Sequence, residues 1–348
     1  MALTEAGVRE ALKAVKFPGL TRDIVSFGFV RAVSVDGGAV RVEIVMTTAN
    51  ASAGPEVERN ARAVLEALPG VSRVEVACTV QAPQAQHAPA SPRAALPGVR
   101  HKVAVASGKG GVGKSTVAAN LALALRRGGV TVGLLDADIY GPSQQMMMGC
   151  VEKPRVNSDE KILPVDGHGV QVMSLGFLMD PDQPVIWRGP MVMKALQQFI
   201  EDVEWGNLDY LVVDLPPGTG DAQLTMTQQV PLDGAVIVTT PQDVALIDAR
   251  KGLAMFQRVN VPVLGLIENM SSFVCPHCGT RSEIFKHGGG RRTAEQLGVP
   301  FLGDIPIDPE IVVGGDSGVP IVASRPESAA AQAFVAVADA VRRQVERS

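Results

Sequence analysis

Short apolar runs recur along the chain after residue 99, and a helical pattern follows each of them. The runs read KVAVAS, VTVGLLDAD, LDYLVVDLP, GAVIVTT and VPVLGLIEN. Continuous apolar strands that alternate with helices are typical of a parallel sheet with helices on both faces. The first predicted helix covers Lys114–Arg127, and its apolar face would pack against that sheet through Val117, Leu121 and Leu125. The pattern therefore predicts an α/β fold with a mostly parallel sheet.

The first 80 residues show a different pattern and predict a small α/β domain. Helices are expected over residues 4–15 and 56–68. Between them, Asp36-Gly37-Gly38 is a turn signal that predicts a β-hairpin. Its second strand is expected to be buried on one face only, because apolar residues alternate along it at Val40, Val42, Ile44 and Met46. After the second helix, Pro69-Gly70 leads into a third strand, VSRVEVACTV.

Residues 81–98, QAPQAQHAPASPRAALPG, are rich in Pro and Ala and have almost no large apolar side chain. Proline fixes φ and removes a backbone donor, so we expect a linker outside any sheet. The 348 residues accordingly predict a small domain over residues 1–80, a linker over 81–98 and a larger domain over 99–348.

Composition and charge are those of a globular protein without a polyanionic partner. Hydrophobic residues make up 46% of the chain and charged residues 20%, and the formal net charge is -4. We therefore expect neither nucleic acid nor a membrane surface as a partner. No stretch approaches the ~20 apolar residues that span a bilayer, and the N-terminus lacks the apolar core of a signal peptide. These features predict a cytoplasmic protein.

The segment GKGGVGKST follows an apolar strand and opens the predicted helix, so it fits the phosphate-loop pattern G-x-x-x-x-G-K-[ST]. Glycines let backbone N–H groups converge on phosphate oxygens, and the helix N-terminus adds partial positive charge. Lys114 is expected to contact the β- and γ-phosphates of ATP, and the Ser115 hydroxyl to ligate Mg²⁺. The expected nucleotide-binding residues of the loop are Gly108, Lys109, Gly110, Gly111, Val112, Gly113, Lys114, Ser115 and Thr116.

Lys109 is not needed to hold phosphates, so its presence makes the motif typical of a narrower group of proteins. G-K-G-G-V-G-K-S-T resembles the deviant phosphate loop of the ParA, MinD and nitrogenase-iron-protein group of P-loop NTPases. The resemblance implies that Lys109 reaches across a dimer interface to the partner's nucleotide. It therefore implies an ATPase that works as a homodimer.

Polar residues follow three of the predicted strands. Asp214 lies where open α/β sheets bind ligands, and it is expected to support Mg²⁺ directly or through water. The resemblance implies that Asp136 lies near the magnesium and that Asp138 orients the attacking water, which makes Lys109, Lys114 and Asp138 the candidate catalytic residues. Asn269 follows another strand at the position where this group contacts the base, expected to be adenine. The loop over residues 216–221 is expected to sense the γ-phosphate.

The motif CPHCG places Cys275 and Cys278 at a spacing that lets both sulfurs face one metal centre. Two thiolates do not complete a four-thiolate site, but two copies of the chain would supply four. That is the usual number for a [4Fe–4S] cluster, and ligand number alone suits structural zinc equally well. Thioredoxin-like redox chemistry is not favoured, because the pair follows a strand and a Ser-rich turn and does not open an obvious helix.

Several motifs in a fixed order resemble the Mrp/ApbC family of iron–sulfur cluster carrier ATPases. They are DADIYGPS, DLPPGTGDAQL, TTPQDVAL and ENMSSFVCPHCG leading to IFKHGGG, and the resemblance runs from about Val99 to near Pro320. It implies a labile [4Fe–4S] cluster at a dimer interface, delivery of the cluster to apoproteins, and a scaffold protein as cluster donor.

The N-terminal unit resembles the accessory domain often fused to such carriers, with one departure. That domain usually has a Cys-Pro soon after its Thr-Thr, whereas Ala51-Ser52 stand there in this chain. A cluster-relay role for the first domain is therefore doubtful. Cys78 and Cys150 are expected to be packing residues.

The main alternative is a positioning ATPase of the MinD or ParA kind, which would need a membrane or DNA surface. MinD-type proteins carry a C-terminal amphipathic helix. The tail SAAAQAFVAVADAVRRQVERS has little apolar bulk beyond Phe334, so we expect it to be a closing helix packed on the domain.

Overall fold

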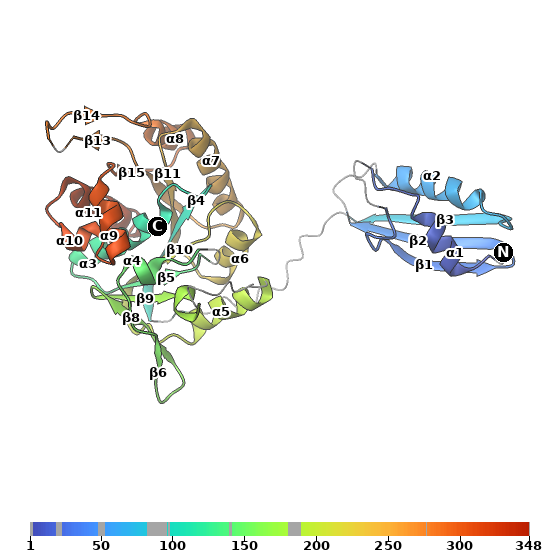
Figure 1. The fold of residues 1–348 in the computed structure, drawn as a ribbon, viewed down its shortest axis with the longest axis horizontal. Coiled ribbons are helices and arrows are strands. Elements are labelled where there is room, and N and C mark those ends of the chain that lie inside the picture. Colours follow the sequence, from blue (N-terminus) through green and yellow to red (C-terminus); the bar gives the residue numbers. More distant parts are fainter. Residues whose placement is uncertain are drawn as a thin grey trace. The chain divides into compact units, whose positions relative to one another are not determined.

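The computed structural model describes residues 3–18, 23–47, 53–81, 96, 98–138, 141–179, 189–275 and 277–347. The chain forms two compact units that divide after Pro89, inside the segment expected to be a linker. Each unit is described by itself (Figure 1).

The N-terminal unit contains two helices and a three-stranded sheet. The elements in chain order are α1 (Glu5–Leu12), β1 (Val30–Asp36), β2 (Ala39–Thr47), α2 (Ala53–Glu66) and β3 (Arg73–Gln81). The predicted hairpin is confirmed, since β1 and β2 are antiparallel, and β3 pairs with β2 in the parallel sense. Helix α2 begins three residues before the expected start at Glu56, and its first two residues, Ala53 and Gly54, are buried.

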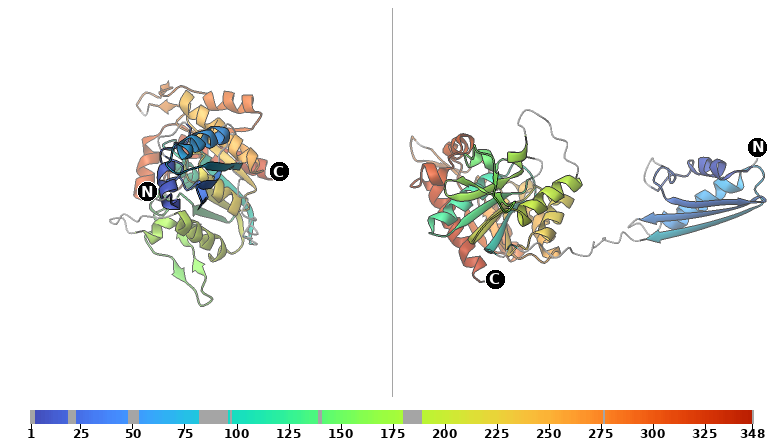
Figure 2. Two further views of the ribbon diagram at one scale, coloured as in Figure 1. Left: turned by 90° about the vertical axis from the view of Figure 1, so that its right-hand side faces the viewer. Right: turned by 90° about the horizontal axis from the view of Figure 1, so that it is seen from below.

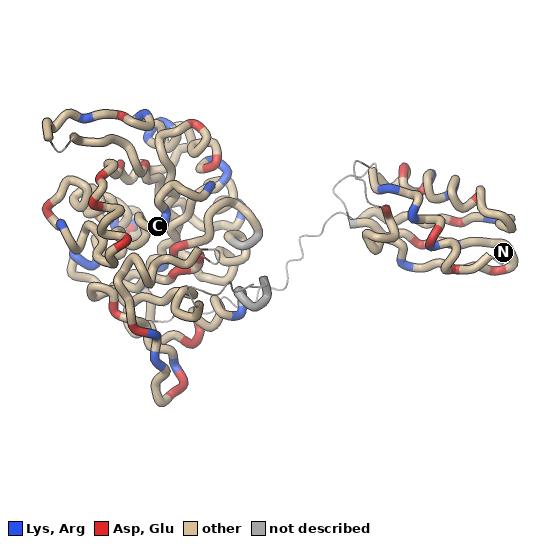
Figure 3. Tube along the Cα trace, in the orientation of Figure 1, with Lys and Arg blue, Asp and Glu red and all other residues tan. Residues whose placement is uncertain are grey.

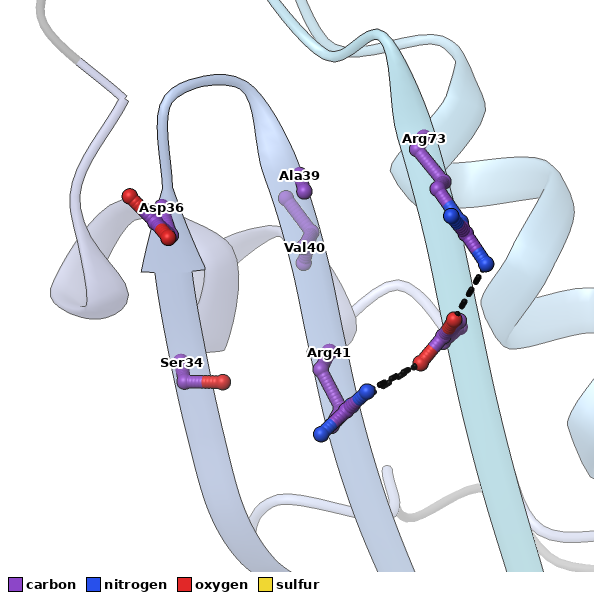
Figure 4. Close-up of a pocket in the computed structure, with 7 residues that line it drawn as sticks. Ser34, Asp36, Ala39, Val40, Arg41 and Arg73 are labelled. Carbon is purple, nitrogen blue, oxygen red and sulfur yellow. Dashed lines mark hydrogen bonds and ion pairs between the residues drawn. The ribbon is translucent and has the colours of Figure 1, made fainter.

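Both helices pack on one face of this sheet, as Figure 2 shows. The prediction for β2 is confirmed, because Val40, Val42, Ile44 and Met46 are each at most 1% exposed. The opposite face is polar. There the Glu75 carboxylate accepts hydrogen bonds from Arg41 Nε at 2.9 Å and from Arg73 at 2.8 Å (Figure 4).

The C-terminal unit is built on an eight-stranded sheet with the order β15-β12-β11-β4-β10-β5-β9-β8. All neighbouring strands are parallel except β8 and β9. All five apolar runs form strands, so the predicted sheet is confirmed. The strands are β4 (Val99–Ser107), β5 (Val132–Asp136), β8 (Val165–Gly167), β9 (Val170–Ser174), β10 (Leu208–Asp214), β11 (Gly234–Thr239), β12 (Val263–Glu268) and β15 (Phe301–Asp304).

Helices cover both faces of this sheet (Figure 1). Helices α3 and α11 contact one face, and α7 and α8 contact the other. The helices are α3 (Lys114–Arg127), α4 (Gln144–Met147), α5 (Gly189–Glu201), α6 (Asp221–Gln229), α7 (Asp243–Arg258), α8 (Gly289–Leu297), α9 (Pro309–Ser317), α10 (Ile321–Ser324) and α11 (Ala329–Val345), with a 3-10 turn at Leu175–Leu178.

Helix α11 confirms the expectation of a packed closing helix. Phe334 and Val341 are fully buried, and the helix packs on α3, β12 and β15. None of the helices in the described ranges is long and apolar enough to cross a membrane.

Two small hairpins project from the sheet. One joins β6 (Arg155–Val156) to β7 (Ile162–Leu163), and the other joins β13 (Phe273–Val274) to β14 (Arg281–Ser282). Acidic and basic residues are interspersed along the trace of both units (Figure 3).

Candidate functional site

The phosphate loop joins β4 to α3 with two close backbone approaches. A β-carbon on Gly108 would lie 2.1 Å from the carbonyl oxygen of Asp248, so α7 packs directly on the start of the loop. Gly113 has φ +80°, and a β-carbon there would lie 2.3 Å from Asn269 Nδ2. Only glycine combines this left-handed conformation with such a close neighbour. Helix α3 begins at Lys114, so its free N–H groups point into the loop.

Lys114 is the electrostatic centre of the loop. Its ammonium group donates to the buried carboxylate of Asp214 and lies 3.3 Å from Asp138, so the structure brings three predicted site residues together. Burial acts to lower the pKa of Lys114, but the carboxylates of Asp214 and Asp138 overcome it and hold that pKa above its usual value. The ammonium group therefore stays charged although its side chain is only 6% exposed.

Asp136 is held by donors from the segment that follows β5 and by Ser174 at the end of β9. Its fully buried carboxylate accepts hydrogen bonds from the backbone N–H groups of Asp138, Ser143 and Gln144 and from the Ser174 hydroxyl. Burial, followed by the charge of Asp214, raises the pKa of Asp136 to about 7 against the lowering effect of these donors. In this conformation Asp136 organises the loop after β5.

Gln144 is a buried site residue that the sequence patterns did not indicate. Its Nε2 donates to the Ser115 carbonyl at 3.0 Å and to Asp214 at 2.8 Å. Its Oε1 is buried and has no hydrogen-bond partner within the part of the chain that the structure describes. An unused acceptor beside Ser115 and Asp214 suits a water molecule bound to Mg²⁺. Only the fold brings this residue of α4 to the phosphate loop, so no spacing in the sequence marks it.

A cavity of about 310 Å³ opens above the loop. Lys109 lines it, and no ion pair joins Lys109 to another residue in the described ranges. Pro217, from the predicted switch loop, also lines the cavity, and the Gly218 N–H donates to the Ser107 carbonyl at 3.0 Å. The remaining lining residues are Ser107, Gly110, Gly111, Gly113, Lys114, Ser115, Thr116, Asp138, Ser143 and Met147.

Asn269 lies against the phosphate loop. It directly follows β12, and its Nδ2 donates to the Val112 carbonyl at 2.9 Å. In this conformation the side chain supports the loop backbone, and its predicted contact with a base stays a prediction.

The cysteine pair lies at the turn of the β13–β14 hairpin. The Cys275 N–H donates to the Thr280 carbonyl at 3.0 Å, and the Gly279 N–H donates back to the Cys275 carbonyl at 2.9 Å. Cys278 is exposed and Cys275 is half-buried. No group of three or more His, Cys, Asp or Glu side chains suited to a metal ion forms among the residues with described positions. The hairpin thus presents two thiols without a third ligand from the described chain.

Thr280 lies beside the exposed thiol of Cys278. Its hydroxyl oxygen lies 3.2 Å from Cys278 Sγ. Hydrogen bonds from the side chain of Thr280, then from its backbone, hold the pKa of Cys278 below the usual value. A thiolate favoured in this way is suited to binding a metal.

The other two cysteines lie in packed environments. Cys150 is buried, as expected, and burial raises its pKa to about 11. Cys78 is half-buried rather than fully buried, because it lies on the edge strand β3 beside the core of the small unit. Ala51 and Ser52, where a cysteine was expected by family pattern, lie outside the described residues.

Two protein families match the chain. Residues 98–342 match the NUBPL iron-transfer P-loop NTPases, and residues 5–77 match a family of iron–sulfur cluster assembly proteins. The iron–sulfur cluster carrier protein of Synechocystis is 47% identical over 348 residues, which cover 99% of this chain and 98% of that protein.

Solved structures agree with these matches. A nucleotide-binding protein of Archaeoglobus fulgidus in complex with ADP is 40% identical and superposes with a TM-score of 0.57 over 63% of this chain and 87% of that one. The cell division ATPase MinD of Pyrococcus furiosus is 25% identical, with a TM-score of 0.55 over 70% of this chain and 98% of its own.

Proposed function

Because the chain belongs to the iron–sulfur cluster carriers of the NUBPL type, a family of P-loop NTPases, we propose that two copies of it share one [4Fe–4S] cluster and deliver it to apoproteins. The cluster is the cargo, received from a scaffold protein. Cys275 and Cys278 of each copy would supply its four thiolates. The observation that carries this proposal is the exposed two-thiol hairpin without a third ligand in the described chain.

The residues around the cysteines support a second copy of the chain as the source of the other two thiolates. Val274, Ile284 and Phe285 flank the pair in the sequence and are 48%, 56% and 38% exposed. Exposed apolar groups around a half-complete ligand set favour a surface that another protein covers. Lys109 in the nucleotide cavity, without an ion-pair partner among the described residues, is consistent with a lysine that acts across the same interface.

ATP is the proposed nucleotide, and its hydrolysis the proposed reaction. Lys114 would exchange part of its contact with Asp214 and Asp138 for the β- and γ-phosphates. Asp138 would then orient the attacking water, and Lys109 of the other copy would stabilise the charge that develops on the phosphate.

Mg²⁺ fits this site through Ser115 and through water. The carboxylate oxygens of Asp136 and Asp214 already accept hydrogen bonds, so Asp214 would reach the ion through a water molecule. The buried acceptor of Gln144 would bind another such water. When bound, the ion would supply positive charge that stabilises the negative charge of the phosphates.

Anaerobic reconstitution of the cluster tests whether the protein carries the proposed cargo. We expect a brown protein with about four iron and four sulfide per dimer, and its loss in a Cys275→Ala/Cys278→Ala variant that still binds ATP. Cys150→Ala is the matched control and should keep the cluster, because that thiol is buried away from the hairpin. Zinc without sulfide in anaerobically purified protein would identify a structural site instead.

Oligomeric state and membrane binding test the remaining alternatives. A strictly monomeric ATP-loaded protein would contradict the shared cluster. Strong co-sedimentation with vesicles in the presence of ATP would favour a positioning ATPase, although the apolar residues of α11 are already buried in the domain.

A further inference from the structure

Glu268 holds together the two ends of the segment that carries the cysteines. Its fully buried carboxylate accepts hydrogen bonds from the backbone N–H groups of Gly288 at 2.9 Å and Gly290 at 2.5 Å. Gly290 lies in the first turn of α8, where free N–H groups and the helix dipole favour a negative charge. The chain leaves β12 at Glu268, makes the cysteine hairpin and returns to the same carboxylate 20 residues later.

The next residue along the chain contacts the nucleotide loop. Asn269 donates to the Val112 carbonyl, and its amide group occupies the space that the missing side chain of Gly113 leaves open. Met270, which follows, has φ +57°, an uncommon conformation for this residue type. Two neighbouring side chains at the end of β12 therefore have different partners. Asn269 contacts the nucleotide loop, and Glu268 contacts the end of the segment that carries the cysteines.

The residues that lead into the hairpin are fixed to the same edge of the sheet. Ser271 and Ser272 are buried, the Ser271 hydroxyl lies 3.1 Å from an Asp304 carboxylate oxygen, and the Ile307 N–H donates to the Ser272 carbonyl at 2.6 Å. Residues 268–272 thus form a short rigid connection, and the thiols lie beyond it at the exposed turn.

We propose that Glu268 is a positioning residue that couples the nucleotide loop to the cysteine hairpin. This inference rests on the proposed function, in which the loop binds nucleotide and the hairpin holds the cluster. A shift of the Val112 backbone on nucleotide binding moves Asn269 and the adjacent Glu268. Because the carboxylate is bound to two backbone N–H groups, the shift is passed to Gly288 and α8 and changes the geometry of the thiols.

A carboxylate is needed because both of its oxygens accept. The glutamine of Glu268→Gln offers one acceptor and turns an NH₂ group toward a backbone donor, so one of the two contacts is lost. The side chain keeps its volume and does not touch the nucleotide cavity. The substitution should therefore separate coupling from nucleotide binding.

The test measures alkylation of Cys275 and Cys278 by iodoacetamide in the full-length, cluster-free, reduced protein, with and without a non-hydrolysable ATP analogue and Mg²⁺. In the unsubstituted protein we expect nucleotide to change the rate about fivefold or more, the lower end of usual coupling between two sites. In Glu268→Gln the ratio of the alkylation rates with and without nucleotide should fall to near one, while the affinity for the ATP analogue is retained. Glu268→Gln with normal affinity and an unchanged ratio would overturn the proposal.

Glu283→Gln is the matched control, because Glu283 is an exposed residue beside the same hairpin and should keep the full nucleotide effect. Should Glu268→Gln fail to fold, Gly290→Ala replaces it. A β-carbon there would lie 3.0 Å from Glu268 Cβ and 3.1 Å from its Oε2, so it displaces the contact and keeps the charge. Loss of the nucleotide effect in Gly290→Ala supports the proposal, and a retained effect overturns it.

Failure of the coupling is distinguishable from failure of the proposed function. If the unsubstituted protein binds neither nucleotide nor iron, the proposed function fails, and the coupling fails with it. If it binds both but its thiol reactivity ignores nucleotide, only the coupling is wrong.

Discussion

Lys114 and Asp214, which lie 100 residues apart in the sequence, form a buried ion pair at the edge of the sheet where the phosphate loop begins. Strand β10 holds the carboxylate and the first turn of α3 holds the ammonium group. The pair is thus a product of the fold, and it links stability to nucleotide binding through one lysine.

Lys114→Ala should weaken both properties. Loss of charge-assisted contacts to phosphate, at about 1.5–3 kcal/mol each, predicts ATP binding at least about tenfold weaker. Leaving buried carboxylates without their partner is expected to lower the free energy of unfolding by roughly 3–5 kcal/mol. Calorimetric titration with ATP and urea unfolding would measure the two effects.

Lys109→Ala is the control for the stability effect, because Lys109 forms no ion pair in the described part of the chain. Its free energy of unfolding should stay within about 0.5 kcal/mol of the unsubstituted protein. Equal stability of Lys114→Ala and the unsubstituted protein would show that the buried pair does not stabilise the fold.

The phosphate loop could be predicted from the sequence because its chemistry is local. The spacing of Gly108, Gly113, Lys114 and Ser115 within one turn between strand and helix is sufficient to identify it. The same holds for the five apolar strands, whose pattern alone predicts burial on both faces.

Long-range contacts could not be predicted in the same way. Gln144, in α4, contacts Asp214 only because the fold brings α4 to the end of β10. Glu268 contacts Gly290 only because the chain returns to the end of β12 after the cysteine hairpin. Neither residue lies in a motif whose spacing indicates that role. The sequence patterns do not predict strands β8, β9 and β15 of this sheet, since runs of three, five and four residues without strong flanking signals resemble connections.

Gly113→Ala should disrupt the phosphate loop beyond the usual cost of a left-handed residue. The strain at φ +80° amounts to about 1–2 kcal/mol, and the new methyl group would also displace Asn269 from Val112. We expect a larger loss of unfolding free energy together with ATP binding at least about tenfold weaker.

Gly129→Ala provides the comparison for that experiment. Gly129 has the same φ of +80°, but a β-carbon there would meet nothing within 4 Å. It should cost only the left-handed strain and leave ATP affinity unchanged. Equal effects of the two substitutions would mean that the contact between Asn269 and the loop is unimportant.

Phe334→Ala should show that α11 is part of the core. Phe334 is fully buried, and removing a buried phenylalanine side chain costs about 3–5 kcal/mol through lost burial and the cavity that remains. Thermal unfolding would measure it, and Val335→Ala, at a half-buried position of the same helix, should cost less. A loss of vesicle binding without a loss of stability would instead favour the membrane-anchor alternative.

Thr280→Val should raise the pKa of Cys278. The valine keeps the shape of threonine but removes the hydroxyl group that lies 3.2 Å from Sγ and stabilises the thiolate. Because the thiolate is the reactive form, the alkylation rate rises with pH through the thiol pKa. The profile of the variant should therefore shift to higher pH, and Cys278 should react more slowly at pH 7 than in the unsubstituted protein.

The measurement is a pH–rate profile for iodoacetamide, with the modified cysteine located by fragmentation mass spectrometry. Cys150 is the internal reference, because burial raises its pKa to about 11 and should make it slow in both proteins. Superimposable Cys278 profiles would mean that the Thr280 hydroxyl does not stabilise the thiolate. A shift confined to Cys278, with Cys150 unchanged, would show that the hairpin itself prepares this thiol as a metal ligand before any cluster is bound.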